Sequence, residues 1–118
     1  KRRVYNFWAS WCQPCLVEMP RFAALGRERK DVEVWMVNLD SWNAAEAKME
    51  RIVAQRDLGH LQHMRHAKKD STTDVTSELR DFGDTIPVTF VVGPSGKHEA
   101  TIVGAASASD LARVLPKP

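Results

Sequence analysis

The spacing of hydrophobic residues along the chain alternates between the short apolar runs of buried strands and the three- and four-residue spacing of helices. Residues 4–9 and 32–40 are apolar runs rich in aromatic and β-branched side chains, which are typical of strands. Between them, apolar residues spaced by three and four predict a helix from about 16 to 30, with Pro20 inside it as the cause of a kink. Alanines and spaced apolar residues predict a second helix over 44–56.

The second half of the chain predicts one more helix, a hairpin and a last helix. Apolar residues spaced by four and three favour a helix over 71–82. Residues 86–92 and 99–103 are predicted strands, joined by a Gly-Pro-Ser-Gly turn. Strands that alternate with helices and then end in a hairpin predict an α/β fold, with a mixed central β-sheet flanked by helices on both faces. Sites in such sheets lie beyond the carboxyl ends of parallel strands.

Polar and glycine residues mark where these helices begin and end. Asp40–Ser41 gives a helix-start signal before the helix over 44–56. Ser107 or Ser109 caps the last helix, and Gly83 ends the helix before the hairpin.

Composition limits the chain to one ordinary domain. It has 118 residues, 43% of them hydrophobic and 27% charged, with a net charge of +2. Residues 1–118 are therefore expected to form a single domain, and the small charge excess without a basic cluster argues against nucleic-acid binding. No apolar run approaches the roughly 18 residues that span a bilayer. Because the chain opens without Met or a signal peptide, we expect that an N-terminal leader or anchor has been removed from a longer protein.

The two cysteines directly follow the first predicted strand, in the sequence Cys12-Gln13-Pro14-Cys15. The first N–H groups of a helix lack intrahelical partners and the helix dipole favours negative charge there, so a cysteine at this position is stabilised as thiolate. In such motifs the thiol pKa falls from about 8.5 to roughly 3.5–7.5. Three residues on, Cys15 faces the same side and can close a disulfide. The spacing suits a reversible couple in which Cys12 attacks and Cys15 resolves.

Metal and haem sites are the alternatives for this motif. Zinc usually takes four ligands, and the chain has no second cysteine pair. Haem attachment needs a histidine directly after the second cysteine, where Leu16 stands instead. In the stretch over 58–69, for which no element is predicted, His60, His63 and His66 recur every three residues and suggest copper or zinc. No acidic or thiolate ligand accompanies them, so we favour an exposed basic surface and predict neither a metal site nor a cofactor.

Two separated motifs resemble one family. They are the segment Phe7–Cys15, followed by Glu18 and Pro20, and the much later segment Ile86–Phe90, followed by Gly93 and Gly96. This pattern resembles the thioredoxin superfamily, and more narrowly its TlpA-like branch of exported thiol–disulfide oxidoreductases, which includes the ResA and CcmG reductants of cytochrome c maturation. The resemblance covers nearly the whole chain from Val4 onward and implies a thioredoxin-like fold.

The resemblance also implies roles for single residues. Cys12 matches the exposed attacking cysteine and Cys15 the buried resolving one. Pro87 matches the family's cis-proline, which sits against the active-site disulfide and leaves the backbone of Ile86 free to pair with an extended partner segment. An ordinary trans proline at a strand edge is the alternative for Pro87. Trp11, beside Cys12, would contribute to the surface that binds the partner.

Gln13 and Pro14 are assigned to the same substrate-binding surface, and Trp8 to the core. Asn6 departs from the family pattern, because cytosolic thioredoxins carry a buried aspartate as proton acceptor six residues before the first cysteine. Glu18 instead matches an acidic residue that lies near the two thiols in ResA-like proteins, where a partly buried carboxylate could shuttle the proton of the resolving cysteine. An exposed helix glutamate is the alternative.

The function predicted from these features is that of an enzyme, a thiol–disulfide oxidoreductase that exchanges dithiol and disulfide with protein substrates. The resemblance favours a monomeric reductant of the cytochrome c maturation or a related exported type, in the periplasm or another extracytoplasmic compartment, regenerated by an upstream membrane thiol reductase. A disulfide oxidant, or a thioredoxin-fold module that binds a partner or a metal, remains the alternative.

Overall fold

The computed structural model describes residues 1–40, 46–65 and 85–117. Its elements, in chain order, are β1 (Arg2–Trp8), α1 (Gln13–Glu28), β2 (Val32–Asn38), α2 (Glu46–Gln55), β3 (Gln62–Arg65), β4 (Val88–Val92), β5 (His98–Val103) and α4 (Ala108–Val114). Within this described part of the chain, no helix is both long and apolar enough to cross a membrane.

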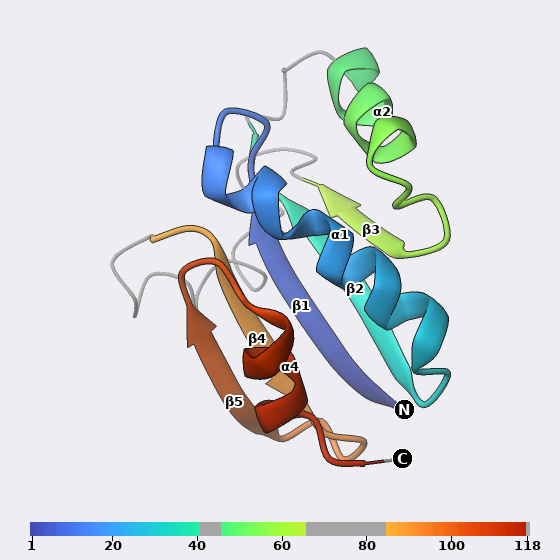
Figure 1. The fold of residues 1–118 in the computed structure, drawn as a ribbon, viewed down its shortest axis with the longest axis vertical. Helices are drawn as coiled ribbons and strands as arrows, with labels where there is room; N and C mark the ends of the chain where they lie inside the picture. Colours follow the sequence, from blue (N-terminus) through green and yellow to red (C-terminus); the bar gives the residue numbers. More distant parts are fainter. Residues whose placement is uncertain (41–45, 66–84, 118) are drawn as a thin grey trace.

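The strands form one mixed sheet in the order β3-β2-β1-β4-β5. β1 pairs in parallel with β2, and β2 with β3, whereas β4 runs antiparallel to both β1 and β5. Figure 1 shows α1 crossing over β1 and β2 while α4 lies over β4 and β5. The predicted α/β fold with a mixed sheet is confirmed. The helix expected over 71–82 lies outside the described residues.

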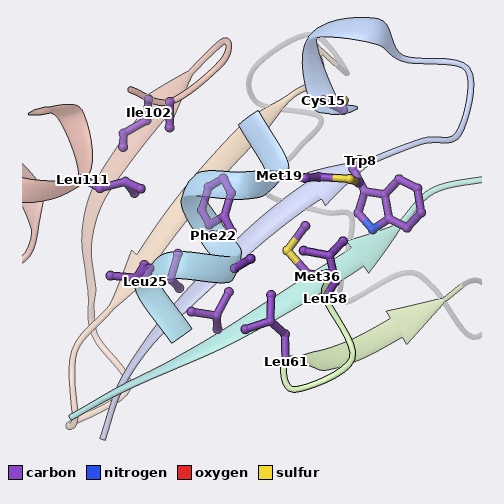
Figure 2. Close-up of a cluster of buried hydrophobic side chains, with 14 of the residues drawn as sticks. Trp8, Cys15, Met19, Phe22, Leu25, Met36, Leu58, Leu61, Ile102 and Leu111 are labelled. Carbon is purple, nitrogen blue, oxygen red and sulfur yellow. The ribbon is translucent and has the colours of Figure 1, made fainter. Parts of the chain in front are cut away.

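The main hydrophobic core fills the space between the sheet and its helices. Alternate residues of the strands face the helices, as the two-residue period of a strand requires. Figure 2 shows Phe22 of α1 toward Met36 of β2, with Leu58 and Leu61 from the segment before β3 near Met36. Leu25 lies on the side of α1 nearer Leu111 of α4. This packing fixes α1, and with it the cysteine motif at its N-terminus, against the sheet.

The opposite face of the sheet carries a second apolar cluster. Phe7 of β1, Val37 of β2, and Val88 and Phe90 of β4 are all buried in it. The rings of Phe7 and Phe90 meet edge to face with centroids 5.3 Å apart, a favourable arrangement for an aromatic pair. Both faces of β1 are therefore buried, as its continuous apolar sequence predicts.

The strand β3 was not predicted from the sequence. It is only four residues long and polar, and it pairs with β2 from Trp35↔Gln62 to Asn38↔Arg65. A polar edge strand lacks the apolar alternation by which strands are recognised in a sequence. His63 lies in this strand, whereas His60 precedes it. His66 lies outside the described residues.

Pro20 lies inside α1, as predicted, and changes one hydrogen bond of the helix. A proline has no N–H, so the carbonyl of Leu16, four residues earlier, lacks its usual helical donor. Arg56 supplies a replacement, since its Nη1 donates to the Leu16 oxygen at 3.3 Å. The first turns of α1 are thereby tied to the end of α2.

Candidate active site at the carboxyl end of β1

Several chain segments meet at one end of the sheet. β1 ends at Trp8, opposite Asn38 at the end of β2. The antiparallel partner β4 begins at Val88, and Val88 pairs with Val103 at the end of β5. The connections that follow β1, β2 and β5, and the one that precedes β4, therefore all leave the sheet at the same end. Predicted site residues far apart in the sequence lie in these connections.

Cys12 and Cys15 are joined by a disulfide at the N-terminus of α1, with their Cα atoms 5.3 Å apart. Cys12 is the N-cap residue, and its Sγ accepts a hydrogen bond from the Cys15 N–H at 3.3 Å. Cys15 is fully buried, as predicted, but Cys12 is only 5% exposed, so the expectation of an exposed attacking cysteine is wrong for this oxidised form. When the disulfide opens, the N–H groups and the dipole of α1 favour a thiolate at Cys12.

The residues beside Cys12 that are predicted to bind substrate are exposed. Trp11 is 70% exposed, a large value for an indole, and Gln13 and Pro14 are exposed as well. Trp8, by contrast, is 1% exposed and belongs to the core. The exposed side chains therefore lie on either side of Cys12 in the sequence, on the connection and first turn that carry it.

The Ile86–Pro87 peptide bond is cis. Pro87 is buried, and its carbonyl oxygen accepts a hydrogen bond from Gly104 N at 2.9 Å. Gly104 has a φ of +88°, a conformation that other residues rarely adopt. Ile86 is half-buried and lies outside the strand ladder, since β4 begins at Val88. The backbone before Pro87 thus lies outside the sheet, at the same end from which the connection with Cys12 leaves it.

Glu18 is fully buried on the side of α1 that faces the sheet. Its Oε1 accepts a hydrogen bond from Asn6 Nδ2 at 2.6 Å, and its Oε2 accepts one from Ala106 N at 2.6 Å. Asn6 Nδ2 also donates to Thr89 Oγ1 at 3.1 Å. The glutamate thus joins α1 to β1 and to the segment after β5. The alternative of an exposed helix residue is wrong.

Burial raises the pKa of Glu18 from its ordinary value of 4.5 to about 6, because a charged carboxylate loses its hydration in the core. Three smaller effects oppose this change: the hydrogen bond from Ala106, the hydrogen bond from Asn6, and the positive charge of Arg21. A carboxyl group whose pKa lies near neutrality can both accept and release a proton under ordinary conditions.

A second polar network next to Cys12 was missed in the sequence. Its place before the helix over 44–56 predicts that Asp40 marks a helix start, yet its carboxylate accepts hydrogen bonds from both the backbone N and the Oγ of Ser10. Asn38 Nδ2 donates to the same carboxylate at 2.8 Å. Ser10 and Asp40 are 30 residues apart in the sequence, so no local pattern predicts their contact. The contact becomes visible only when the ends of β1 and β2 lie side by side.

The described histidines do not gather into a metal site. The Nε2 of His60 lies 2.9 Å from the Ala23 carbonyl oxygen, and the Nε2 of His63 lies 2.9 Å from that of Leu58. Among residues 1–40, 46–65 and 85–117, no group of three or more potential metal ligands from His, Cys, Asp and Glu comes together.

Comparisons with known proteins agree with this geometry. The AhpC/TSA family model matches residues 1–100. The thiol-disulfide oxidoreductase ResA of Oceanobacillus iheyensis is 33% identical over 104 residues, which cover 86% of this chain and 49% of that protein. The thiol:disulfide interchange protein HelX of Rhodobacter capsulatus is 30% identical over 106 residues, or 88% of this chain and 53% of HelX. The chain thus spans about half the length of these relatives.

A solved structure of a related protein has a similar fold. The crystal structure of StoA from Bacillus subtilis superposes with a TM-score of 0.75 and 25% sequence identity, covering 96% of this chain and 81% of that one. The chain belongs to the AhpC/TSA family, in the ResA-like branch of the thioredoxin superfamily.

Proposed function

We propose that this chain is a thiol–disulfide oxidoreductase that exchanges the Cys12–Cys15 couple with disulfides or thiol pairs of proteins. The observation that carries the proposal is the disulfide at the N-terminus of α1, where Cys12 Sγ already accepts the N–H of Cys15. A backbone donor and a helix dipole at the attacking sulfur lower the free energy of its thiolate. Similarity to ResA and HelX supports the same activity.

In the reducing direction, the Cys12 thiolate attacks one sulfur of the partner disulfide, and the other partner sulfur leaves as a thiolate. This step gives a mixed disulfide between Cys12 and the partner. Cys15 then loses its proton and attacks Cys12 Sγ, which releases the second partner sulfur. The partner gains two electrons and becomes a dithiol, while this chain is left with the Cys12–Cys15 disulfide.

Glu18 is proposed as the group that accepts the proton of Cys15. It follows Cys15 by three residues, about one helical turn, and both side chains are fully buried. A buried thiol needs a nearby base before it can attack, and the raised pKa of Glu18 suits that task near neutral pH. Asn6, which cannot take up a proton at this position, holds Glu18 by a hydrogen bond instead.

The partner is proposed to bind over the exposed residues beside Cys12. Trp11 offers a large apolar surface, Gln13 and Pro14 border the sulfur, and Ile86 offers backbone groups outside the sheet ladder. An extended segment of the partner could pair with that backbone as an added strand. Pro87 would then close the side of the site next to the disulfide.

The direction is proposed to be reductive, in an extracytoplasmic compartment such as the periplasm, as a monomer that an upstream membrane thiol reductase regenerates. Similarity to ResA and HelX supports a role of the cytochrome c maturation or a related exported type. We also propose that residues 1–118 form one thioredoxin-like domain. A midpoint potential of about −270 mV, measured against glutathione, would support the reductant, whereas one of about −120 mV would indicate an oxidant.

Trapping of the intermediate tests the proposal directly. The wild-type chain is expected to catalyse the reduction of insulin by dithiothreitol, and Cys15→Ser is expected to accumulate a mixed disulfide with insulin through Cys12. Cys12→Ser serves as the matched control, because it keeps one cysteine and removes the attacking one. If neither the wild type nor Cys15→Ser forms any mixed disulfide, the chain is not an oxidoreductase. Trapping by Cys12→Ser alone would reverse the roles of the two cysteines.

A further inference from the structure

The connection that carries Cys12 is a tight turn of four residues between β1 and α1. Cys12 N donates to the Ala9 carbonyl oxygen at 3.1 Å, so Ser10 and Trp11 occupy the corner of the turn. Both polar groups of Ser10 bind one carboxylate: Ser10 N donates to Asp40 Oδ2 at 3.0 Å, and Ser10 Oγ donates to Asp40 Oδ1 at 2.9 Å. The turn is therefore fixed from outside by a residue that follows β2.

Asp40 is itself held firmly. It is 5% exposed, its Oδ2 also accepts from Asn38 Nδ2 at 2.8 Å, and its N–H donates back to Asn38 Oδ1 at 3.1 Å. Asn38 pairs in register with Trp8, and Leu39 N donates to the Trp8 carbonyl oxygen at 2.8 Å. Hydrogen bonds to a charged acceptor are short and strongly oriented. The position of Ser10 is thus set by the paired ends of β1 and β2.

A helix-capping role does not explain this carboxylate. The side-chain oxygen of a capping residue accepts from N–H groups two or three residues further along the chain. Both Asp40 oxygens instead accept from residues that precede Asp40, namely Ser10 and Asn38. Its contacts therefore serve the turn before Cys12.

We propose that Asp40 is a positioning residue for Cys12, acting through Ser10 to hold the turn that keeps the Cys12 sulfur at the N-terminus of α1. The proposal deepens the proposed function and rests on Cys12 as the attacking cysteine. Cys12 gains its N–H donor and the helix dipole only while its Sγ stays at the cap position, where it accepts the Cys15 N–H. A looser turn moves the sulfur away from those groups.

The direction in which the Cys12 pKa changes when Asp40 is removed shows whether Asp40 acts by positioning Cys12 or only through its negative charge. Asp40 is negative, so removing its charge alone would ease formation of a thiolate nearby. Loss of the hydrogen bonds to Ser10 has the opposite effect, because the thiolate loses its place at the cap. The other buried carboxyl group of the site, Glu18 on α1, is unchanged in all of the variants below. A rise in the Cys12 pKa on removal of Asp40 therefore points to positioning.

The test follows the rate of iodoacetamide alkylation of Cys12 against pH, in the reduced protein with Cys15→Ser as the background. Asp40→Ala is expected to raise the Cys12 pKa by about one unit. At pH values well below that pKa, the thiolate fraction, and with it the alkylation rate, then falls about tenfold. Ser10→Ala, which leaves the charge of Asp40 in place, is expected to change the pKa in the same direction by less. The double variant is expected to match Asp40→Ala, since both changes remove the same contact.

Asp31→Ala is the matched control, because Asp31 lies at the opposite end of β2 and binds Arg29 through both oxygens. It is expected to leave the alkylation profile of Cys12 unchanged. A lower or unchanged Cys12 pKa in folded Asp40→Ala overturns the proposal. If that variant does not fold, an unchanged pKa in Ser10→Ala overturns it. Absence of any mixed disulfide with insulin, in both the wild type and Cys15→Ser, would refute the proposed function instead, so the two results are distinguishable.

Discussion

Replacing Glu18 by Gln should change how the stability of the protein depends on pH. The substitution removes an ionisable group from a site where it is fully buried, and it keeps the length and shape of the side chain. A glutamine oxygen can still accept from Ala106 N. The glutamine amide can donate to Asn6 if the Asn6 amide turns over, because Asn6 Oδ1 has no hydrogen-bond partner within the described part of the chain. The main consequence is therefore electrostatic.

The magnitude follows from the pKa of Glu18. Burial raises that pKa from 4.5 to about 6 in the folded chain, so between these two values the folded state binds the proton more tightly than the unfolded state does. The free energy of unfolding is then highest below about pH 4.5, falls as the pH rises through about 6, and is constant above that range. The expected loss is about 2 kcal/mol, at about 1.4 kcal/mol for each pKa unit.

Urea unfolding followed by tryptophan fluorescence, on the oxidised wild type and on Glu18→Gln from pH 4 to pH 8, measures this loss. The difference between the two proteins cancels the titration of all other groups. Glu28→Gln is the matched control, because Glu28 is exposed at the far end of the same helix. As a surface substitution it should change the free energy of unfolding by at most about 0.5 kcal/mol at any pH.

Two outcomes would refute the reasoning about Glu18. If the difference in free energy of unfolding between the wild type and Glu18→Gln stays constant from pH 4 to pH 8, burial does not raise the pKa. If the wild type instead gains stability relative to the variant as the pH rises, the hydrogen bonds from Asn6 and Ala106 outweigh the loss of hydration. The same variant should alter the pH dependence of the thiols in the reduced protein, and unchanged thiol titrations would remove Glu18 from the mechanism.

Other substitutions test the packing and the caps by urea unfolding. Asn6→Asp should place a second carboxyl group against Glu18 and lower the free energy of unfolding at pH 7 by about 3 kcal/mol, with a smaller loss at pH 4; equal losses would argue against charge repulsion. Ser107→Ala should cost about 1 kcal/mol, because Ser107 caps α4 in a reciprocal capping box. Phe22→Ala should cost about 3–5 kcal/mol, whereas Val17→Ala on the exposed side of α1 should cost under about 0.5; similar losses would contradict the assigned core.

Local patterns were enough to predict most of the elements. The apolar runs of β1 and β2 and the spaced apolar residues of α1 reflect burial that repeats with the period of the backbone. The capping role of Ser107 is confirmed, since its hydroxyl accepts the N–H of Asp110. β3 was missed because its four polar residues are held by backbone pairing with β2, which leaves no hydrophobic signal in the sequence.

Some parts of the candidate site could also be predicted from local sequence patterns, and others could not. The Cys12–Cys15 pair and the segment around Pro87 could be recognised because each is a contiguous motif. The partners of Glu18 could not, since Asn6 lies 12 residues away in the sequence and Ala106 lies 88 residues away. Which groups surround a carboxylate, and therefore its pKa, depends on how α1 packs on the sheet.

β1 connects the two polar networks, and this has a consequence for the whole site. Asn6 and Trp8 are two residues apart on the face of β1 that packs against α1: Asn6 holds Glu18 one turn beyond Cys15, and the Trp8 backbone holds the segment that leads to Asp40. A register slip of one residue would turn Asn6 to the opposite face of the sheet and break the pairing that aligns Asp40 with the turn before Cys12. The burial of both faces of β1 therefore also protects the chemistry, because it gives that slip a high cost in the core.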